Sequence, residues 1–130
     1  MNGLEVGTEL PEVSQRAELT TSVAYAAASG DLNPLHYDPD FAGQVSPTGG
    51  IIAHGMYAMG LASRVLTEFA GGAERVAEVN VRFTRPWPLH STTTFGGTVT
   101  NLDEEFATVR LWGRNDSGEQ ILKGVGKIRV

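Results

Sequence analysis

The fold is decided by residues 51–70, whose sequence is IIAHGMYAMGLASRVLTEFA. No charged side chain precedes Arg64 in this stretch, and apolar residues would occupy every side of the helix that it forms. A helix that is apolar all round is buried all round. The stretch therefore predicts one central helix about 30 Å long, enclosed by the rest of the chain and ended by Gly71-Gly72.

The segments around this helix predict mostly antiparallel strands. Alternation of apolar and polar residues is clearest in Glu78–Thr84, where Val79, Val81 and Phe83 share one face. It recurs in residues 105–113, where Ala107, Val109 and Leu111 would face inward. We expect further strands at 13–19, 91–102, 105–113 and 119–130, a helix at about 22–29 capped by Thr20 or Thr21, at most one helical turn at 39–43, a bulge at Gly96-Gly97 and a hairpin turn at 115–118. These elements predict an α+β domain in which a curved antiparallel sheet wraps a central helix.

Length and composition narrow the class of protein. The 130 residues are enough for one domain, and we expect it to span residues 1–130. The chain has no cysteine, and its three histidines lack the spacing of metal ligands, so no metal site is expected. A net charge of −5 argues against nucleic-acid binding. Without a signal peptide or a membrane-length apolar segment, the expected location is the cytoplasm.

Residues 25–36, YAAASGDLNPLH, carry the candidate chemistry. Asp31 and His36 lie on either side of Asn33-Pro34, and proline excludes a continuous helix there. A carboxylate and an imidazole on one rigid loop can share a water molecule or a substrate proton, as general acid–base catalysis requires. The alternative is a helix cap followed by a polar turn, with His36 only solvated.

The longer pattern resembles the signature of the MaoC-like family. The similar motifs are Tyr25 to Phe41, Ala53-His54-Gly55-Met56 and Val81-Arg82-Phe83-Thr84-Arg85-Pro86. The family includes R-specific enoyl-CoA hydratases and the 3-hydroxyacyl dehydratases of fatty acid synthesis. The resemblance implies a hot-dog fold and a hydro-lyase that needs no cofactor, because the substrate is carried on coenzyme A or acyl carrier protein. It also implies a homodimer or higher homo-oligomer, and a heterodimer is a further possibility.

The resemblance implies roles for individual residues. Asp31 and His36 would hold the water that adds to a trans-2-enoyl thioester, giving an (R)-3-hydroxyacyl thioester, or would catalyse the reverse dehydration. The N–H of Gly55 would polarise the thioester carbonyl, unless this glycine only permits close helix–sheet packing. Asn33 would orient the pair or close an Asx turn, and His54 is expected to make a structural hydrogen bond. Arg82 and Arg85 are candidates for binding the phosphates of coenzyme A, with a solvated strand face as the alternative for Arg82.

Two other functions compete with this one. A hot-dog thioesterase commonly places a carboxylate on the central helix, and none occurs between Gly49 and Thr67. A non-catalytic acyl-binding subunit of a heterodimeric dehydratase would be expected to lose the Asp31–His36 pair, which this chain keeps. Acyl chain length, the carrier, the direction of the reaction and the partner chain are left open by the sequence.

Overall fold

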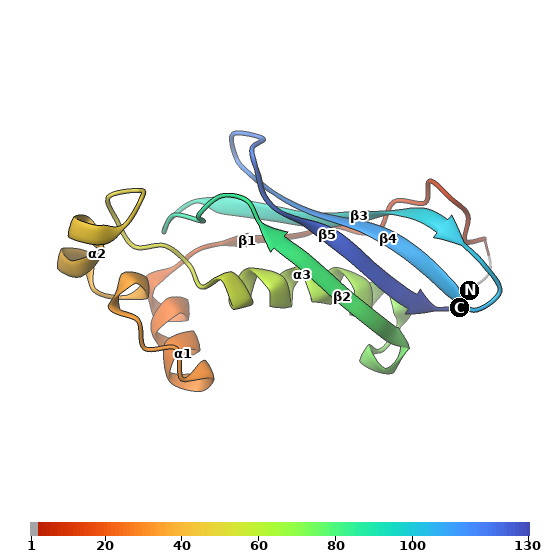
Figure 1. The fold of residues 1–130 in the computed structure, drawn as a ribbon, viewed down its shortest axis with the longest axis horizontal. Helices are drawn as coiled ribbons and strands as arrows, with labels where there is room; N and C mark the ends of the chain where they lie inside the picture. The colour runs from red at the N-terminus through yellow and green to blue at the C-terminus, as the bar shows by residue number, and fades with distance from the viewer. Residues whose placement is uncertain (1–2) are drawn as a thin grey trace.

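A computed structural model describes residues 3–130, in which a five-stranded sheet curls over one long helix (Figure 1). The elements along the chain are β1 (Val13–Arg16), α1 (Leu19–Ser29), a 3₁₀ turn (Pro34–His36), α2 (Pro39–Val45), α3 (Gly55–Ala70), a second 3₁₀ turn (Ala73–Arg75), β2 (Val76–Phe83), β3 (Thr92–Leu102), β4 (Phe106–Asn115) and β5 (Gln120–Arg129). The strand order is β1-β3-β4-β5-β2, and every pairing is antiparallel. This is the hot-dog fold that the sequence predicted.

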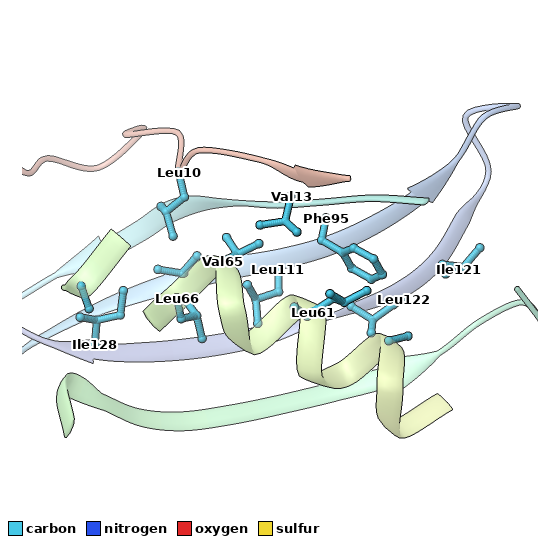
Figure 2. Close-up of a cluster of buried hydrophobic side chains, with 14 of the residues drawn as sticks. Leu10, Val13, Leu61, Val65, Leu66, Phe95, Leu111, Ile121, Leu122 and Ile128 are labelled. Carbon is cyan, nitrogen blue, oxygen red and sulfur yellow. The ribbon is translucent and has the colours of Figure 1, made fainter. Parts of the chain in front are cut away.

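The core lies between α3 and the face of the sheet that α3 covers. Side chains alternate along β4, so that Ala107, Val109 and Leu111 are fully buried while the residues between them point away. Figure 2 shows Leu61, Val65 and Leu66 of α3 turned toward these strands. The inward alternation predicted for β4 is thereby confirmed.

The central helix is shorter and less enclosed than predicted. Residues 51–54 are extended rather than helical, because Ala53 N–H donates to the carbonyl oxygen of Trp87 at 2.8 Å. Within α3, Leu61, Val65 and Leu66 are buried, but Met56 is 60% exposed. The prediction that the central helix is buried on every side was therefore wrong for a single chain, because the sheet covers only one side of α3.

The elements before α3 also differ from the prediction at their ends. The helix α1 begins at Leu19 after Glu18, which makes no side-chain cap, so neither threonine is the N-cap. The helix α2 has seven residues instead of one turn, because Asp38 accepts from the N–H groups of Asp40 and Phe41. Figure 1 shows α1 and α2 at the end of the molecule where α3 begins. The connecting segment is therefore built beside the start of the long helix.

The glycine pair in β3 has a role other than the expected bulge. The register between β3 and β4 is continuous from Thr93 to Val99 and shifts only between Val99 and Asn101. A Cβ atom on Gly96 would overlap the indole of Trp112. Gly96 thus leaves room for an aromatic ring on the adjacent strand. None of the helices among residues 3–130 is both long enough and apolar enough to cross a membrane.

Candidate active site

The loop with Asp31 and His36 is shaped by short-range hydrogen bonds. Gly30 ends α1 in the left-handed conformation with a φ of 78°. The side chain of Asp31 accepts from Asn33 N–H at 3.3 Å, and the side chain of Asn33 accepts from Leu35 N–H at 3.1 Å. The Asx turn considered for Asn33 is present, and it starts the 3₁₀ turn that carries His36 inward.

Hydrogen bonding sets the proton position on the His36 ring. The Nδ1 atom of His36 lies 2.7 Å from the carbonyl oxygen of Ile52, an acceptor, so Nδ1 carries the proton. In the neutral ring Nε2 then has a free lone pair, and it lies 3.8 Å from Oδ2 of Asp31. That separation is too long for a direct hydrogen bond. A water molecule placed between the two atoms can bond to both.

His54 contacts both Asp31 and His36 in the loop. Its side chain is buried, and its Nε2 donates to the carbonyl oxygen of Asp31 at 3.2 Å. Its ring stacks on His36 with centroids 3.9 Å apart. Burial lowers the pKa of His54, and the nearby His36 adds to this effect, while the hydrogen bond to Asp31 opposes it. His54 is therefore neutral at pH 7, and the structural hydrogen bond expected for it is present.

A chain of aromatic rings connects the loop to the core. Tyr25 lies against His54, with ring centroids 4.7 Å apart, and against Tyr57 at 5.5 Å. Tyr57 stacks on Trp87 at 5.9 Å, and Trp87 meets Phe95 edge-on at 5.8 Å. Because Trp87 and Phe95 are buried, the loop rests on rigid parts of the molecule. The sequence did not single out Tyr57 or Trp87 for this role.

His36, His54 and Gly55 line a pocket of about 320 Å³ at the start of α3. Gly55 is the first residue of α3, so its N–H has no acceptor within the helix. A Cβ atom on Gly55 would lie 3.1 Å from the ring of Phe83, which closes another side of the pocket. The two roles considered for Gly55 are therefore compatible. Its N–H has no acceptor within the helix, and its lack of a side chain permits close packing against Phe83. Asp31 is not among the lining residues, and its side chain is 53% exposed.

The structure separates the two arginines that the sequence grouped. Arg85 lines the pocket and forms an ion pair with Glu119 at 3.2 Å. Arg82 lines a different cavity, on the face of the sheet turned away from α3. Neighbouring residues of a strand point to opposite faces, so Arg82 lies opposite to Phe83. The two arginines therefore do not line one cavity, and phosphate binding by either of them stays a prediction.

The fold brings together three groups that could hold a metal ion. One donor atom each from Asp31, His36 and His54 lies within 4.8 Å of the others, although the spacing of the histidines in the sequence did not indicate a metal site. Nε2 of His54 donates its proton to a carbonyl oxygen, which leaves Nδ1 as the atom of that ring with a free lone pair. The expectation that the site holds no metal therefore stays a prediction.

The fold and the site together define a class of protein. It comprises hot-dog domains that carry an aspartate–histidine pair on a loop beside the start of the central helix. Within it, residues 5–117 match the family described as MaoC like domain. The chain is 31% identical over 116 residues to the 3-oxo-4,17-pregnadiene-20-carboxyl-CoA hydratase beta subunit of Mycobacterium tuberculosis, with 89% of each chain covered. It therefore belongs to the MaoC-like family.

Other relatives match in part or in structure. A 3-hydroxybutyryl-CoA dehydratase of Methylorubrum extorquens is 45% identical over 65 residues, a match that covers 48% of this chain and 39% of that protein. An (R)-hydratase from A. caviae superposes with a TM-score of 0.90 and 28% identity, covering 100% of this chain and 99% of its own. A chain of the ChsH1–ChsH2 complex of Mycobacterium tuberculosis gives a TM-score of 0.86 at 28% identity, a match that covers 97% of this chain and 98% of that chain.

Proposed function

We propose that the protein catalyses the reversible hydration of trans-2-enoyl thioesters to (R)-3-hydroxyacyl thioesters. The observation that carries the proposal is the position of His36, whose Nε2 lies 3.8 Å from the Asp31 carboxylate and whose ring lines the same pocket as Gly55. The names of the hydratase and dehydratase relatives support the same reaction class. The R configuration rests on the family resemblance and on the (R)-hydratase neighbour.

The mechanism follows from the positions of these groups. A water molecule held between Asp31 and His36 adds its oxygen to C3 of the enoyl group, and Nε2 of His36 takes its proton. Negative charge moves to the thioester oxygen, where the N–H of Gly55 and the N-terminal end of α3 stabilise it. The proton then reaches C2, directly or through Asp31, so that one water has been added. Reversal of these steps eliminates water.

The remaining site residues act by positioning. Asn33 holds the 3₁₀ turn that carries His36, and His54 holds the carbonyl of Asp31. Arg85 is placed to meet a negatively charged part of the substrate at the pocket, in competition with Glu119. No cofactor enters these steps, and the acyl group is carried on coenzyme A or on acyl carrier protein.

The thioesterase alternative is disfavoured by the central helix. The only carboxylate in α3 is Glu68, which is held by Arg64 at 2.6 Å near the far end of the helix from the pocket. A non-catalytic subunit is disfavoured because both Asp31 and His36 are present and face each other.

We further propose that the protein acts as an oligomer, as a homodimer or paired with a related chain. The strand β2 is an edge of the sheet, and open edges invite pairing with another chain. Met56 and Phe83, which are 60% and 47% exposed, lie near the pocket and would be covered by a second chain. A complex of two different chains is found among the structural neighbours.

The test is hydration of crotonyl-CoA through dodecenoyl-CoA, followed by loss of the absorbance of the enoyl thioester. We expect activity in the wild type and a loss of about 10²-fold or more in Asp31→Asn and in His36→Ala. Glu68→Gln is the matched control, because it alters a carboxylate outside the pocket, and it should keep the wild-type rate. Equal rates in all four proteins would remove the pair from the mechanism, and release of free thiol would indicate a thioesterase.

A further inference from the structure

A second cavity lies on the face of the sheet turned away from α3. It has a volume of about 560 Å³ and crosses β2, β5 and β4. Its main lining side chains are Arg82, Arg110, Trp112, Arg114, Lys123 and Val125. Its volume is within the usual range of small-molecule sites. We call this cavity the outer groove.

The outer groove concentrates positive charge on a negatively charged protein. Four of the chain's ten lysine and arginine residues line it, whereas the whole chain has a net charge of −5. The one acid in the lining, Glu78, lies 3.5 Å from Lys127 and is partly neutralised there. The outer groove is therefore a local site of attraction for anions.

The cations in the outer groove have no acidic partner. Arg82 lies directly opposite Lys123 in the pairing of β2 with β5, and like charges in such positions destabilise a sheet. Among the ion pairs formed by residues 3–130, none includes any of the four basic residues of the outer groove. An anion bound between them would relieve this repulsion.

An aromatic surface adjoins these charges. Lys123 is opposite Trp112 in the pairing of β4 with β5, and the guanidinium of Arg114 lies over the Trp112 ring at 4.4 Å from its centre. Gly96 makes space for this ring, since a Cβ atom there would overlap it. Flat aromatic and guanidinium groups bind nucleobases by stacking, and arginine donors match phosphate oxygens.

We propose that the outer groove binds a nucleotide with two or more phosphate groups. The phosphates bind Arg82, Arg110 and Lys123, and the base lies against the Arg114–Trp112 pair. The nucleotide is either the nucleotide end of a coenzyme A thioester or a free nucleotide. The four cations surround one aromatic ring on adjacent strands, an arrangement that suits a single small anion with an aromatic base better than an extended acidic protein surface.

The site is separate from the catalytic pocket. Phe83 and Ile121 line the pocket, while their neighbours Arg82 and Gln120 line the outer groove, so the two cavities lie on opposite faces of the same strands. Nucleotide binding therefore does not depend on the proposed function, and it is measurable without turnover. A coenzyme A thioester that occupied both cavities would place its acyl group in the pocket and its nucleotide in the outer groove. The pantetheine arm that joins them would have to pass the end of β2 at Thr84 and Arg85.

The experiment is calorimetric titration of the full chain with ADP, with coenzyme A and with inorganic phosphate. Removing two cations in Arg110→Gln/Lys123→Gln should weaken ADP binding about a hundredfold, since each charged hydrogen bond contributes about tenfold. Arg75→Gln is the matched control, because Arg75 is an exposed cation that is not part of the outer groove, and it should bind ADP as the wild type does. Unfolding curves establish that the variants remain folded.

A second readout separates the two sources of the nucleotide. If the double variant raises KM for crotonyl-CoA but not for crotonyl-pantetheine, the ligand is the nucleotide end of coenzyme A. If ADP binding is lost while both KM values hold, the ligand is a free nucleotide. The proposal is overturned if the wild type binds neither ADP nor coenzyme A. It is also overturned if the double variant binds them unchanged, if Arg75→Gln weakens binding equally, or if only an acidic protein binds.

Discussion

Replacement of His54 by leucine tests whether this residue positions Asp31 and His36 for the proposed reaction. Leucine keeps a buried side chain of similar size but cannot donate to the carbonyl oxygen of Asp31, which His54 does at 3.2 Å. It also removes the stacking of His54 on His36, whose ring centroids are 3.9 Å apart. The loop would keep its own short-range hydrogen bonds and the hydrogen bond from His36 to Ile52, but would lose both contacts with His54.

The magnitude follows from these two contacts. The hydrogen bond contributes about 1 kcal/mol, and a packed ring pair about 0.5–1.5 kcal/mol. The free energy of unfolding, measured by urea denaturation, should therefore fall by about 1.5–2.5 kcal/mol. Because small displacements of catalytic groups can cost about 10²-fold, kcat for crotonyl-CoA should fall about 10- to 100-fold, less than in His36→Ala. His54→Gln, whose amide can donate in place of Nε2, should recover most of the rate.

The pH dependence of stability gives an independent check. Burial lowers the pKa of His54 below its ordinary value of about 6.5. Below that pH the unfolded chain takes up a proton that the folded chain does not, so the wild type loses stability as the pH falls from about 6.5 through the lowered pKa. His54→Leu lacks this loss, so the difference in unfolding free energy between the two proteins should narrow over this range.

The reasoning is refuted by either of two results. If His54→Leu keeps the wild-type kcat while losing stability, His54 does not position the catalytic pair. If the wild type and the variant lose stability in parallel as the pH falls below about 6.5, burial does not lower the pKa of His54 in the folded protein.

Three other changes test the packing around the site. Gly55→Ala should lower both activity and stability, because the added methyl group would approach the Phe83 ring to 3.1 Å. Adding Phe83→Leu should restore stability. A double variant that is as unstable as Gly55→Ala would argue against this contact. Leu66→Ala removes a fully buried side chain of α3 and should lower the free energy of unfolding by about 2–5 kcal/mol in urea, whereas a change below about 1 kcal/mol would contradict the assigned core. Met56→Lys places a charge on the exposed side of α3 and should shift the protein toward monomer in analytical ultracentrifugation; an unchanged oligomer would exclude this side of α3 from the interface.

Much of the fold was readable because its signals are local. The alternation in β4 placed Ala107, Val109 and Leu111 inward, and Gly71 ends α3 as expected. The errors arose where distant segments decide the outcome. Residues 51–54 are as apolar as the helix that follows, but pairing with Trp87 and Pro88 makes them extended. The sequence suggested a bulge at Gly96. The actual reason for a glycine there is the Trp112 ring, which belongs to another strand and could not be placed from the sequence.

The candidate site divides in the same way. The sequence by itself determined that Asp31 and His36 share a short rigid loop, since a proline and two side-chain hydrogen bonds act within a few residues. Only the tertiary structure decided that His54, 23 residues further along, supports Asp31, and that Arg85 faces the pocket while Arg82 faces the outer groove. Turns depend on neighbouring residues, whereas contacts across the sheet and between segments depend on how the whole chain packs.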